Sequence, residues 1–105
     1  MARRLTSETA ERFLSDVEHE KSFFINEGPA LRNIIQLHDA LSSISDKQFY
    51  FHRNNNKNDF YNWIKNVIGD SRLANDVARA KTRQTIIKRI KKRIELLGAL
   101  KAKNA

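Results

Sequence analysis

Hydrophobic residues recur at helical spacing in nearly every segment of this chain. In the first segment, four apolar residues stand at positions i, i+3, i+4 and i+7: Ala10, Phe13, Leu14 and Val17. This pattern predicts an amphipathic helix from Ser7 to Glu20, with Thr6 or Ser7 as its cap. The segment that follows, KSFFINEGP, interrupts the pattern and predicts a break between helices.

A second helix is predicted to begin near Pro29, because proline lacks only an N–H group that would be unpaired in the first helical turn. Its hydrophobic stripe is broad and contains Leu31, Ile34, Ile35, Leu37, Ala40, Leu41 and Ile44. Ser45 then precedes Gln48 by three residues, which is the spacing of a capping box. We therefore expect a short third helix that holds the aromatic residues 49–51.

The second half of the chain contains three more segments with helical spacing. They follow the polar stretch RNNNKN, which predicts a loop. Asp59 is expected to cap a fourth helix that ends at Gly69, since glycine adopts the left-handed conformation at low cost. Asp70 is expected to cap a fifth helix, and Thr82 a sixth helix that ends at Gly98.

Together these elements predict an all-α fold, a compact bundle of five or six short-to-medium helices with a basic C-terminal helix. The 105 residues suffice for one hydrophobic core. We expect residues 1–98 to form a single helical domain and residues 99–105 a flexible basic tail. The chain has no cysteine, no secretory signal pattern and no apolar run long enough to span a membrane, which favours a cytoplasmic protein.

The sixth predicted helix separates its apolar and basic residues onto two faces. Five apolar side chains fall within an arc about 100° wide: Ile86, Ile87, Ile90, Ile94 and Leu97. Basic residues of the segment KRIKKR, at positions 88–93, fill the rest of the circumference. We expect this apolar seam to pack on the other helices and to point the basic face toward solvent.

Positive charge is concentrated in the last quarter of the chain. The formal net charge of the protein is +8. Residues 1–80 contain eleven basic and eleven acidic residues, which cancel, whereas residues 81–105 contain nine basic residues and one acidic residue, Glu95. An ordinary solvent-exposed helix face mixes both signs, so this asymmetry favours an anionic partner.

Nucleic acid, bound through its phosphate backbone, is the favoured partner. The residues expected to make the contacts are Lys81, Lys88, Arg89, Lys91, Lys92, Arg93 and Lys101. Arg53 and Lys57, in the asparagine-rich loop, are expected to add a secondary polar contact. The chain has no zinc-finger, RNP or GXXG motif, so we expect no sequence-specific readout, and DNA, structured RNA and ribosomal RNA are not distinguished.

Two other partners fit the same helix and would make the protein an interaction or scaffold module. Its basic face could dock on an acidic protein. The spacing of Ile87, Ile90, Ile94 and Leu97 would also suit a short coiled-coil seam in a homodimer. A membrane surface is disfavoured, because the seam lacks the Trp or Phe that interfacial helices usually carry.

The sequence contains no arrangement typical of a catalytic or metal site. His19, His38 and His52 lie on separate predicted elements, without the spacing that places two histidines on one metal ion. Three glycines are too few for a phosphate-binding P-loop. We therefore expect no enzymatic activity, no metal and no other cofactor. His52 is expected to pair with Asp59 or Asn58 across the loop.

Residues 49–77 resemble a small domain family of unknown function found in archaeal and bacterial proteins. The family pattern is F-x-F-H, a variable polar loop, N-D-F-x-x-W-[IV] and V-[IL]-G-D-x-x-L-A. The matching residues are Phe49, Phe51, His52, Asn58, Asp59, Phe60, Trp63, Ile64, Val67, Ile68, Gly69, Asp70, Leu73 and Ala74. The leucine-rich segment upstream is also similar, so the resemblance covers roughly residues 22–97. It implies a helical fold without a known activity or ligand, and the basic last helix is not assumed to be shared.

Overall fold

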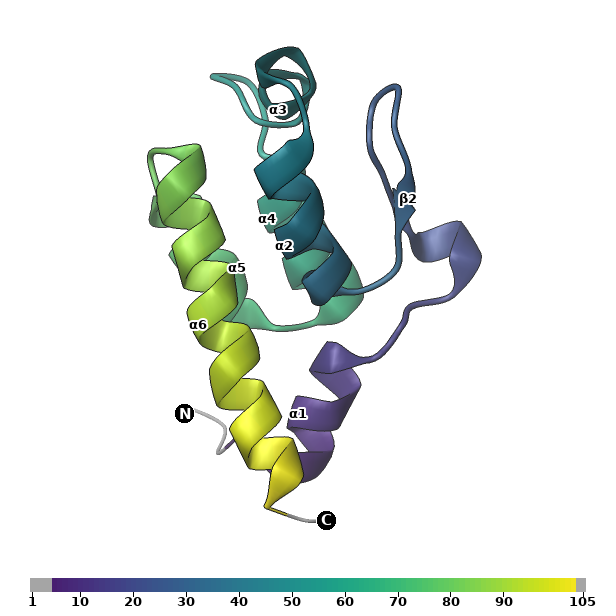
Figure 1. The fold of residues 1–105 in the computed structure, drawn as a ribbon, viewed down its shortest axis with the longest axis vertical. Helices are drawn as coiled ribbons and strands as arrows, with labels where there is room; N and C mark the ends of the chain where they lie inside the picture. Colours follow the sequence, from purple (N-terminus) through teal and green to yellow (C-terminus); the bar gives the residue numbers. More distant parts are fainter. Residues whose placement is uncertain (1–4, 104–105) are drawn as a thin grey trace.

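The computed structural model describes residues 5–103, and it confirms the all-α fold (Figure 1). Its helices are α1 (Ser7–Leu14), α2 (Ile34–Ser43), α3 (Asp46–His52), α4 (Asp59–Trp63), α5 (Ser71–Arg79) and α6 (Arg83–Ala102). A 3₁₀ turn, η1 (His19–Lys21), follows α1, and a π-helical segment, η2 (Ile64–Ile68), continues α4. Two short strands, β1 (Phe23–Phe24) and β2 (Ala30–Leu31), pair in antiparallel orientation.

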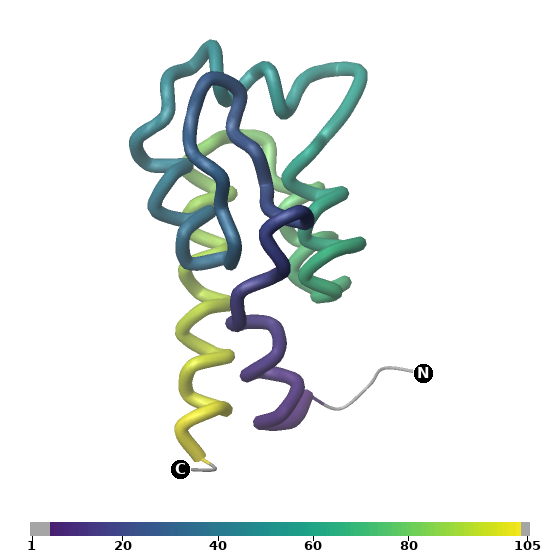
Figure 2. The backbone as a smooth tube through the Cα atoms, turned by 90° about the vertical axis from the view of Figure 1, so that its right-hand side faces the viewer, coloured from purple at the N-terminus to yellow at the C-terminus, as the bar shows by residue number. Residues whose placement is uncertain are grey.

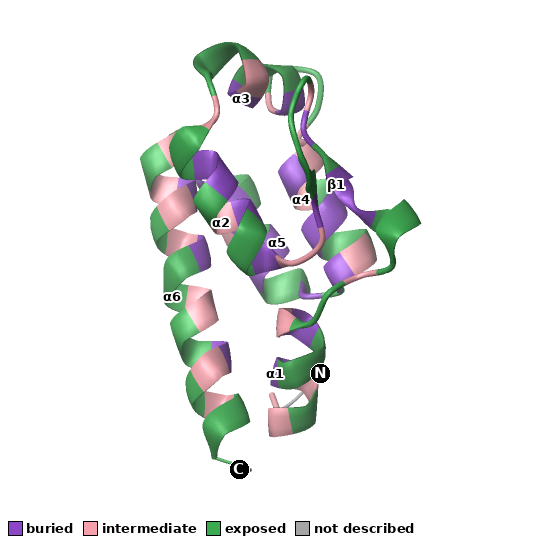
Figure 3. Cartoon of the chain, turned by 45° about the vertical axis from the view of Figure 1, so that its right-hand side comes forward, coloured by how far each residue is buried: buried purple, intermediate pink, exposed green. Residues whose placement is uncertain are grey.

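The longest helix, α6, forms the spine of the molecule. Helix α1 lies beside its C-terminal half, and α2 and α5 lie beside its N-terminal half (Figures 1 and 2). The predicted apolar seam faces these helices: Ile86, Ile90 and Leu97 are fully buried, and Ile87 and Ile94 are half-buried. The opposite side of α6 is mostly exposed (Figure 3). The seam therefore fixes which side of α6 meets solvent.

A stack of aromatic rings forms the core between the hairpin, α3 and α4. Phe60 lies between Phe23 and Phe49, with ring centroids 5.3 and 5.6 Å apart. The Trp63 indole N–H donates to the Lys21 carbonyl at 2.8 Å, so this large ring is buried without leaving its polar atom unpaired. Phe49, Phe60 and Trp63 are all buried in this core.

Five of the predicted helix boundaries are confirmed, and each is set by residues that are close in the sequence. Thr6, Asp70 and Thr82 cap α1, α5 and α6 with their side chains. Ser45 and Gln48 form the predicted capping box at the start of α3. Gly69 ends the helical segment 59–68 with a φ of 89°, in the left-handed region that glycine enters at little cost.

The first helix ends at Leu14 rather than at Glu20. Beyond it, the Val17 N–H donates to the Arg32 carbonyl at 2.7 Å. The Val17 carbonyl accepts two hydrogen bonds from the Arg32 guanidinium, at 2.9 and 2.7 Å. These contacts to a distant segment replace the helical hydrogen bonds of residue 17, although its side chain still packs on the core.

The second helix begins at Ile34 rather than near Pro29. Asn33 caps it, and its side-chain oxygen accepts from the Gln36 N–H at 2.8 Å. Pro29 lies instead in the turn between the two strands, where its carbonyl accepts from the Ile25 N–H at 3.1 Å. The predicted start is wrong because a turn also suits proline, and because the Asn33 side chain supplies the cap four residues later.

Two further boundaries differ from the prediction. Asn58, not Asp59, caps α4, because the Asn58 side chain accepts from the Tyr61 N–H at 3.1 Å. The last helix continues through Gly98 to Ala102. It continues because Leu97 and Leu100 pack on the core on both sides of that glycine.

The predicted flexible tail, residues 99–105, is therefore helical as far as residue 102. Lys103 follows as a turn, and residues 104–105 of that prediction lie outside the described residues.

Candidate functional site

The basic residues of α6 divide by residue type. The arginines point toward the rest of the molecule and are half-buried: Arg83, Arg89 and Arg93. The lysines are exposed: Lys88, Lys91, Lys92 and Lys101, with Lys81 just ahead of the helix. A guanidinium group can donate several hydrogen bonds in a fixed plane, whereas an ammonium group is more strongly hydrated. The nine basic residues of the last quarter therefore do not form one surface.

Arg83 holds the C-terminal end of α2. Its Nη1 donates to the carbonyls of Leu41 and Ile44, at 3.3 and 2.7 Å, and its Nη2 donates to Asp46 at 2.8 Å. The last carbonyls of a helix lack partners within the helix, so this guanidinium satisfies groups that would otherwise need water. It also lies 5.0 Å from the ring centroid of Phe49.

Arg89 and Arg93, both expected to contact phosphate, are engaged with the two ends of α5. Arg89 Nη1 donates to the carbonyl of Asp76 at 2.6 Å. Arg93 donates from Nε and Nη2 to the carboxylate of Asp70, at 2.7 and 2.8 Å. Asp70 also accepts from the Leu73 N–H, which makes it the cap of α5. These two arginines position α6 on α5, and their hydrogen bonds to Asp76 and Asp70 take the place of the phosphate contacts expected of them.

Lys88, Lys91 and Lys92 make up what we call the lysine face of α6. At 3.6 residues per turn they fall within an arc of about 100° opposite the buried seam. None of the ion pairs among residues 5–103 involves these three lysines. Glu95 lies in the same arc and is exposed, so it lowers the local charge without cancelling it.

Of the other two exposed lysines expected to contact phosphate, Lys101 lies on a different side of α6 from the lysine face, whereas Lys81 lies near one end of that face. Lys101 is about 20 Å from Lys88 along the helix axis and is rotated from it by about 140°, so one partner surface cannot easily meet both. Lys81 immediately precedes the cap of α6 and lies near Gln84. On the helix Gln84 is in line with Lys88 and Lys91, because these positions are four and seven residues apart.

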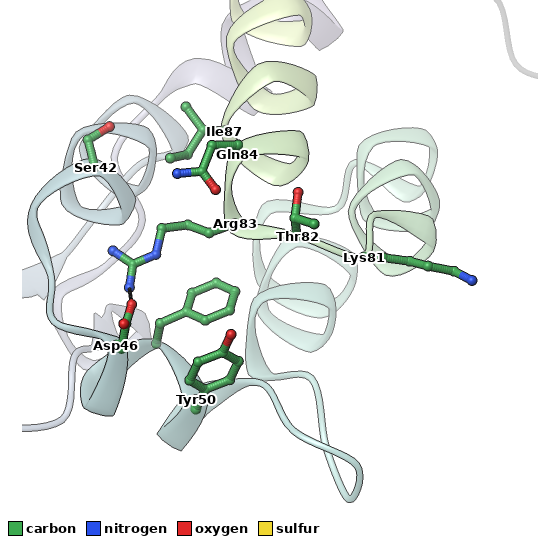
Figure 4. Close-up of a pocket in the computed structure, with 9 residues that line it drawn as sticks. Ser42, Asp46, Tyr50, Lys81, Thr82, Arg83, Gln84 and Ile87 are labelled. Carbon is green, nitrogen blue, oxygen red and sulfur yellow. Dashed lines mark hydrogen bonds and ion pairs between the residues drawn. The ribbon is translucent and has the colours of Figure 1, made fainter.

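An open groove with a volume of about 660 Å³ lies between α3 and the start of α6 (Figure 4). We call it the α3–α6 groove. Its lining residues are Ser42, Asp46, Phe49, Tyr50, Lys81, Thr82, Arg83, Gln84 and Ile87. A smaller hollow of about 400 Å³ adjoins it and shares Phe49, Tyr50 and Lys81 with it. The smaller hollow is completed by the loop residues Arg53, Asn54 and Asn55.

Tyr50 lines this groove, and the sequence pattern assigned no role to it. It is 60 % exposed, whereas its neighbour Phe49 is 3 % exposed. The helical period could have indicated this exposure, because a residue that follows the buried Phe49 is rotated by about 100° toward the side of the short helix.

The two residues that were expected to make a secondary polar contact, Arg53 and Lys57, have different surroundings. Arg53 borders the smaller hollow, whereas the Lys57 ammonium binds Asp59 at 2.9 Å.

His52 joins the loop to the hairpin, as a structural residue. It is buried, its Nδ1 lies 3.0 Å from Asp59 Oδ2, and its Nε2 accepts from the Asn26 N–H at 3.0 Å. Because Nε2 is an acceptor, the ring proton lies on Nδ1 and is donated to Asp59. The predicted pairing with Asp59 is confirmed. Both ring nitrogens have a hydrogen-bond partner: Nδ1 binds Asp59, and Nε2 binds the backbone of Asn26.

The carboxyl group of Asp59 carries a shifted pKa. Its partial burial by itself would raise the pKa, but the hydrogen bonds from His52 and Lys57 outweigh that effect and hold the pKa below its usual value. The carboxylate thus stays ionised and links α4 to the end of α3.

The seam considered for a homodimer is occupied by the protein's own core. Ile90 and Leu97 have no exposed surface, and Ile87 and Ile94 pack against the same cluster. A coiled coil through these residues would have to displace the helices that pack along α6. The seam is therefore not available for dimerisation in this fold.

The described part of the chain contains neither a cluster of side chains that could hold a metal ion nor a helix suited to cross a membrane. No three histidine, aspartate or glutamate side chains within residues 5–103 lie close enough together to hold a metal ion. None of the helices in that part is both long enough and apolar enough to cross a membrane.

No protein-family model matches the chain, and comparison with curated proteins and with solved structures yields no match either. The resemblance of residues 49–77 to an archaeal and bacterial domain family therefore stays a prediction. On the surface formed by residues 5–103, the lysine face and the α3–α6 groove are features that bear on function.

Proposed function

We propose that the protein binds nucleic acid through phosphate contacts made by the lysine face, without reading the base sequence. The observation that carries this proposal is the exposure of Lys88, Lys91 and Lys92 on a helix whose arginines are all turned inward. The buried seam and the three arginines fix the rotation of α6. The lysine face is therefore a rigidly oriented surface rather than a loose charged tail.

The lysine face carries a repulsion at Lys88 that Glu95 does not offset, because Glu95 is at helical spacing from Lys91 and Lys92 only. Lys88 stands three residues from Lys91 and four from Lys92, and like charges at these spacings destabilise a helix by about 0.2–0.5 kcal/mol per pair. A bound polyanion removes this repulsion and gains the attraction of each cation for a phosphate. The charge arrangement is thus easier to account for in a protein that binds an anion.

The shape of the charged surface favours a polyanion over a single phosphate group. From Gln84 at the groove to Lys92 the surface extends for about 12 Å along α6. Lys81 adds a cation at the groove end. Four phosphates neutralised by Lys81, Lys88, Lys91 and Lys92 would give a log–log salt slope of about −3.6 on duplex DNA and about −2.8 on a single strand.

The direct test is charge reversal of the lysine face. The variant Lys88→Glu/Lys91→Glu/Lys92→Glu is titrated against labelled duplex DNA and a labelled single strand, with fluorescence anisotropy as the readout. We expect binding to be lost while the helical circular dichroism is unchanged, because all three side chains are exposed. Arg89 is left intact, since its reversal would break the contact to α5. Unchanged binding by this variant would refute the proposal.

The matched control reverses three exposed cations outside α6. Lys21→Glu/Lys65→Glu/Arg72→Glu changes the net charge by the same amount, on η1, η2 and α5. We expect this variant to retain most of its affinity. Equal losses in the two variants would show that overall charge, and not the lysine face, determines binding.

Nuclease treatment separates nucleic acid from an acidic protein as the partner. Nucleic acid is expected to copurify with the wild-type protein and to be lost after treatment with a nonspecific nuclease. If no nucleic acid copurifies, and an acidic polypeptide such as poly-glutamate binds the lysine face more tightly than oligonucleotides do, the partner is a protein and the proposal is wrong.

A further inference from the structure

Tyr50 presents an aromatic ring to the α3–α6 groove. The ring packs at an angle of 80° against Phe49, with centroids 5.2 Å apart, and the residue remains 60 % exposed. Phe49 itself is covered by the guanidinium of Arg83 and by the ring of Phe60. Tyr50 is thus held by a rigid neighbour and has free surface for a ligand.

The charged side chains near Tyr50 that belong to no ion pair within residues 5–103 are positive. Asp46 is the acidic residue among those lining the groove, and its carboxylate binds Arg83 at 2.8 Å. Lys81 and Arg53 border the groove and the smaller hollow, and neither belongs to an ion pair among residues 5–103. In Figure 4 the Lys81 side chain extends away from the other lining residues. The groove therefore offers the exposed ring of Tyr50, with the two cations Lys81 and Arg53 near it.

The groove opens onto the lysine face. Gln84 lines the groove, and Lys88 and Lys91 follow it one and two turns later on the same side of α6. A chain of phosphates that leaves the groove along α6 would meet these lysines next. The two surfaces can therefore belong to one extended site.

We infer that the α3–α6 groove takes a single-stranded nucleic acid, with one base stacked on Tyr50 and the adjoining phosphates bound by Lys81 and Arg53. The inference rests on the proposed function, since it names the kind of nucleic acid that the lysine face would hold. Bases in a duplex are stacked on one another, and only an unpaired base exposes a face to a protein ring. Stacking on aromatic side chains combined with a cationic path for the backbone is how proteins hold single strands without base-specific contacts.

The experiment compares Tyr50→Ala with Tyr50→Phe, because the second variant keeps the ring and loses only the hydroxyl. Both are titrated with labelled oligo(U) and oligo(dT) strands of about 12 nucleotides, which is within the range of known single-strand sites, and with a duplex of the same length. Loss of one aromatic–base stack corresponds to a weakening of about 5- to 150-fold. We expect Tyr50→Ala to lose this factor on single strands, Tyr50→Phe to bind like the wild type, and duplex binding to be unchanged in both.

The outcomes separate this inference from the proposed function. If Tyr50→Ala binds single strands like the wild type while charge reversal of the lysine face abolishes binding, the groove inference is overturned and the proposed function stands. Equal weakening on single strands and duplex overturns the inference too, because the ring would then not recognise an unpaired base. If the wild type binds no oligonucleotide, both are wrong. Circular dichroism of the two Tyr50 variants excludes unfolding as the cause of any loss.

Discussion

The Arg93 guanidinium donates two hydrogen bonds to the carboxylate of Asp70, at 2.7 and 2.8 Å, with only 13 % and 1 % of the two side chains exposed. The same carboxylate caps α5 through the Leu73 N–H. A buried charge pair adds little net stability compared with apolar residues, but removing one partner strands the other charge in the interior. The pair therefore specifies how α6 sits on α5, which is what aims the lysine face outward.

Removing Arg93 is expected to be the most damaging substitution of a charged residue in α6. Arg93→Met should lower the free energy of unfolding by about 3–5 kcal/mol, because it leaves Asp70 buried and unpaired. Arg93→Lys should recover only part of this, since an ammonium cannot reproduce the two parallel hydrogen bonds. Urea titration followed by circular dichroism measures both.

The adjacent residue supplies the control for this experiment. Lys92→Met removes the same charge one position earlier on the exposed side of the helix. It should change the free energy of unfolding by no more than about 0.5 kcal/mol. Similar losses at positions 92 and 93 would contradict the division of the basic residues into structural arginines and exposed lysines.

The salt dependence of binding should identify which lysines contact phosphate. Lys91→Gln removes one cation of the lysine face, so the log–log salt slope on duplex DNA should become less steep by about 0.9. Lys101→Gln should leave the slope unchanged, because Lys101 is rotated by about 140° from Lys88 along α6. Anisotropy titrations over a series of salt concentrations give the slopes. A change at Lys101 equal to that at Lys91 would contradict the assignment of phosphate contacts to one face.

Stability should depend on the ionisation of Asp59 in acid. Hydrogen bonds from His52 and Lys57 hold its pKa in the folded protein below the usual value of 3.8. The unfolded chain therefore binds the proton more readily, and the contribution of the carboxylate is present above that value and lost as the pH falls through the lower, folded pKa. Unfolding free energies of the wild type and Asp59→Asn should differ at pH 7 and converge at strongly acidic pH. A difference that grows in acid would contradict this sign.

The parts of the fold that the sequence predicted are those fixed by neighbouring residues. A capping side chain bonds to an N–H two or three positions away, so Ser45, Asp70 and Thr82 could be identified without knowing the fold. The apolar seam of α6 is likewise a property of one helix. The cap predicted at Asp59 is wrong because the neighbouring Asn58 side chain caps α4 instead. The helix end predicted at Gly98 is wrong because Leu100 packs on the core and extends α6 beyond the glycine.

The parts that escaped prediction depend on contacts between distant segments. The helical period places Arg93 beside the apolar seam and Lys92 opposite it. The partner of Arg93 could not be read from the helix itself, because Asp70 is 23 residues away in the sequence. The α3–α6 groove is also a tertiary feature, since Tyr50 and Lys81 meet only when α3 packs near the start of α6. A charge count therefore located the basic region but overestimated how much of it is exposed to solvent.

Two glycines that were both assigned as helix ends should respond in opposite ways to alanine. Gly69 has a φ of 89°, which an alanine side chain disfavours by roughly 1–2 kcal/mol, so Gly69→Ala should lower the free energy of unfolding. Gly98 lies inside α6, and a methyl group added there would meet no atom within 4 Å. Gly98→Ala should therefore raise the free energy of unfolding by about 0.5–1 kcal/mol, through the better helix propensity of alanine. Urea titration of both variants checks the signs, and a destabilised Gly98→Ala protein would mean that α6 ends earlier in solution than at Ala102.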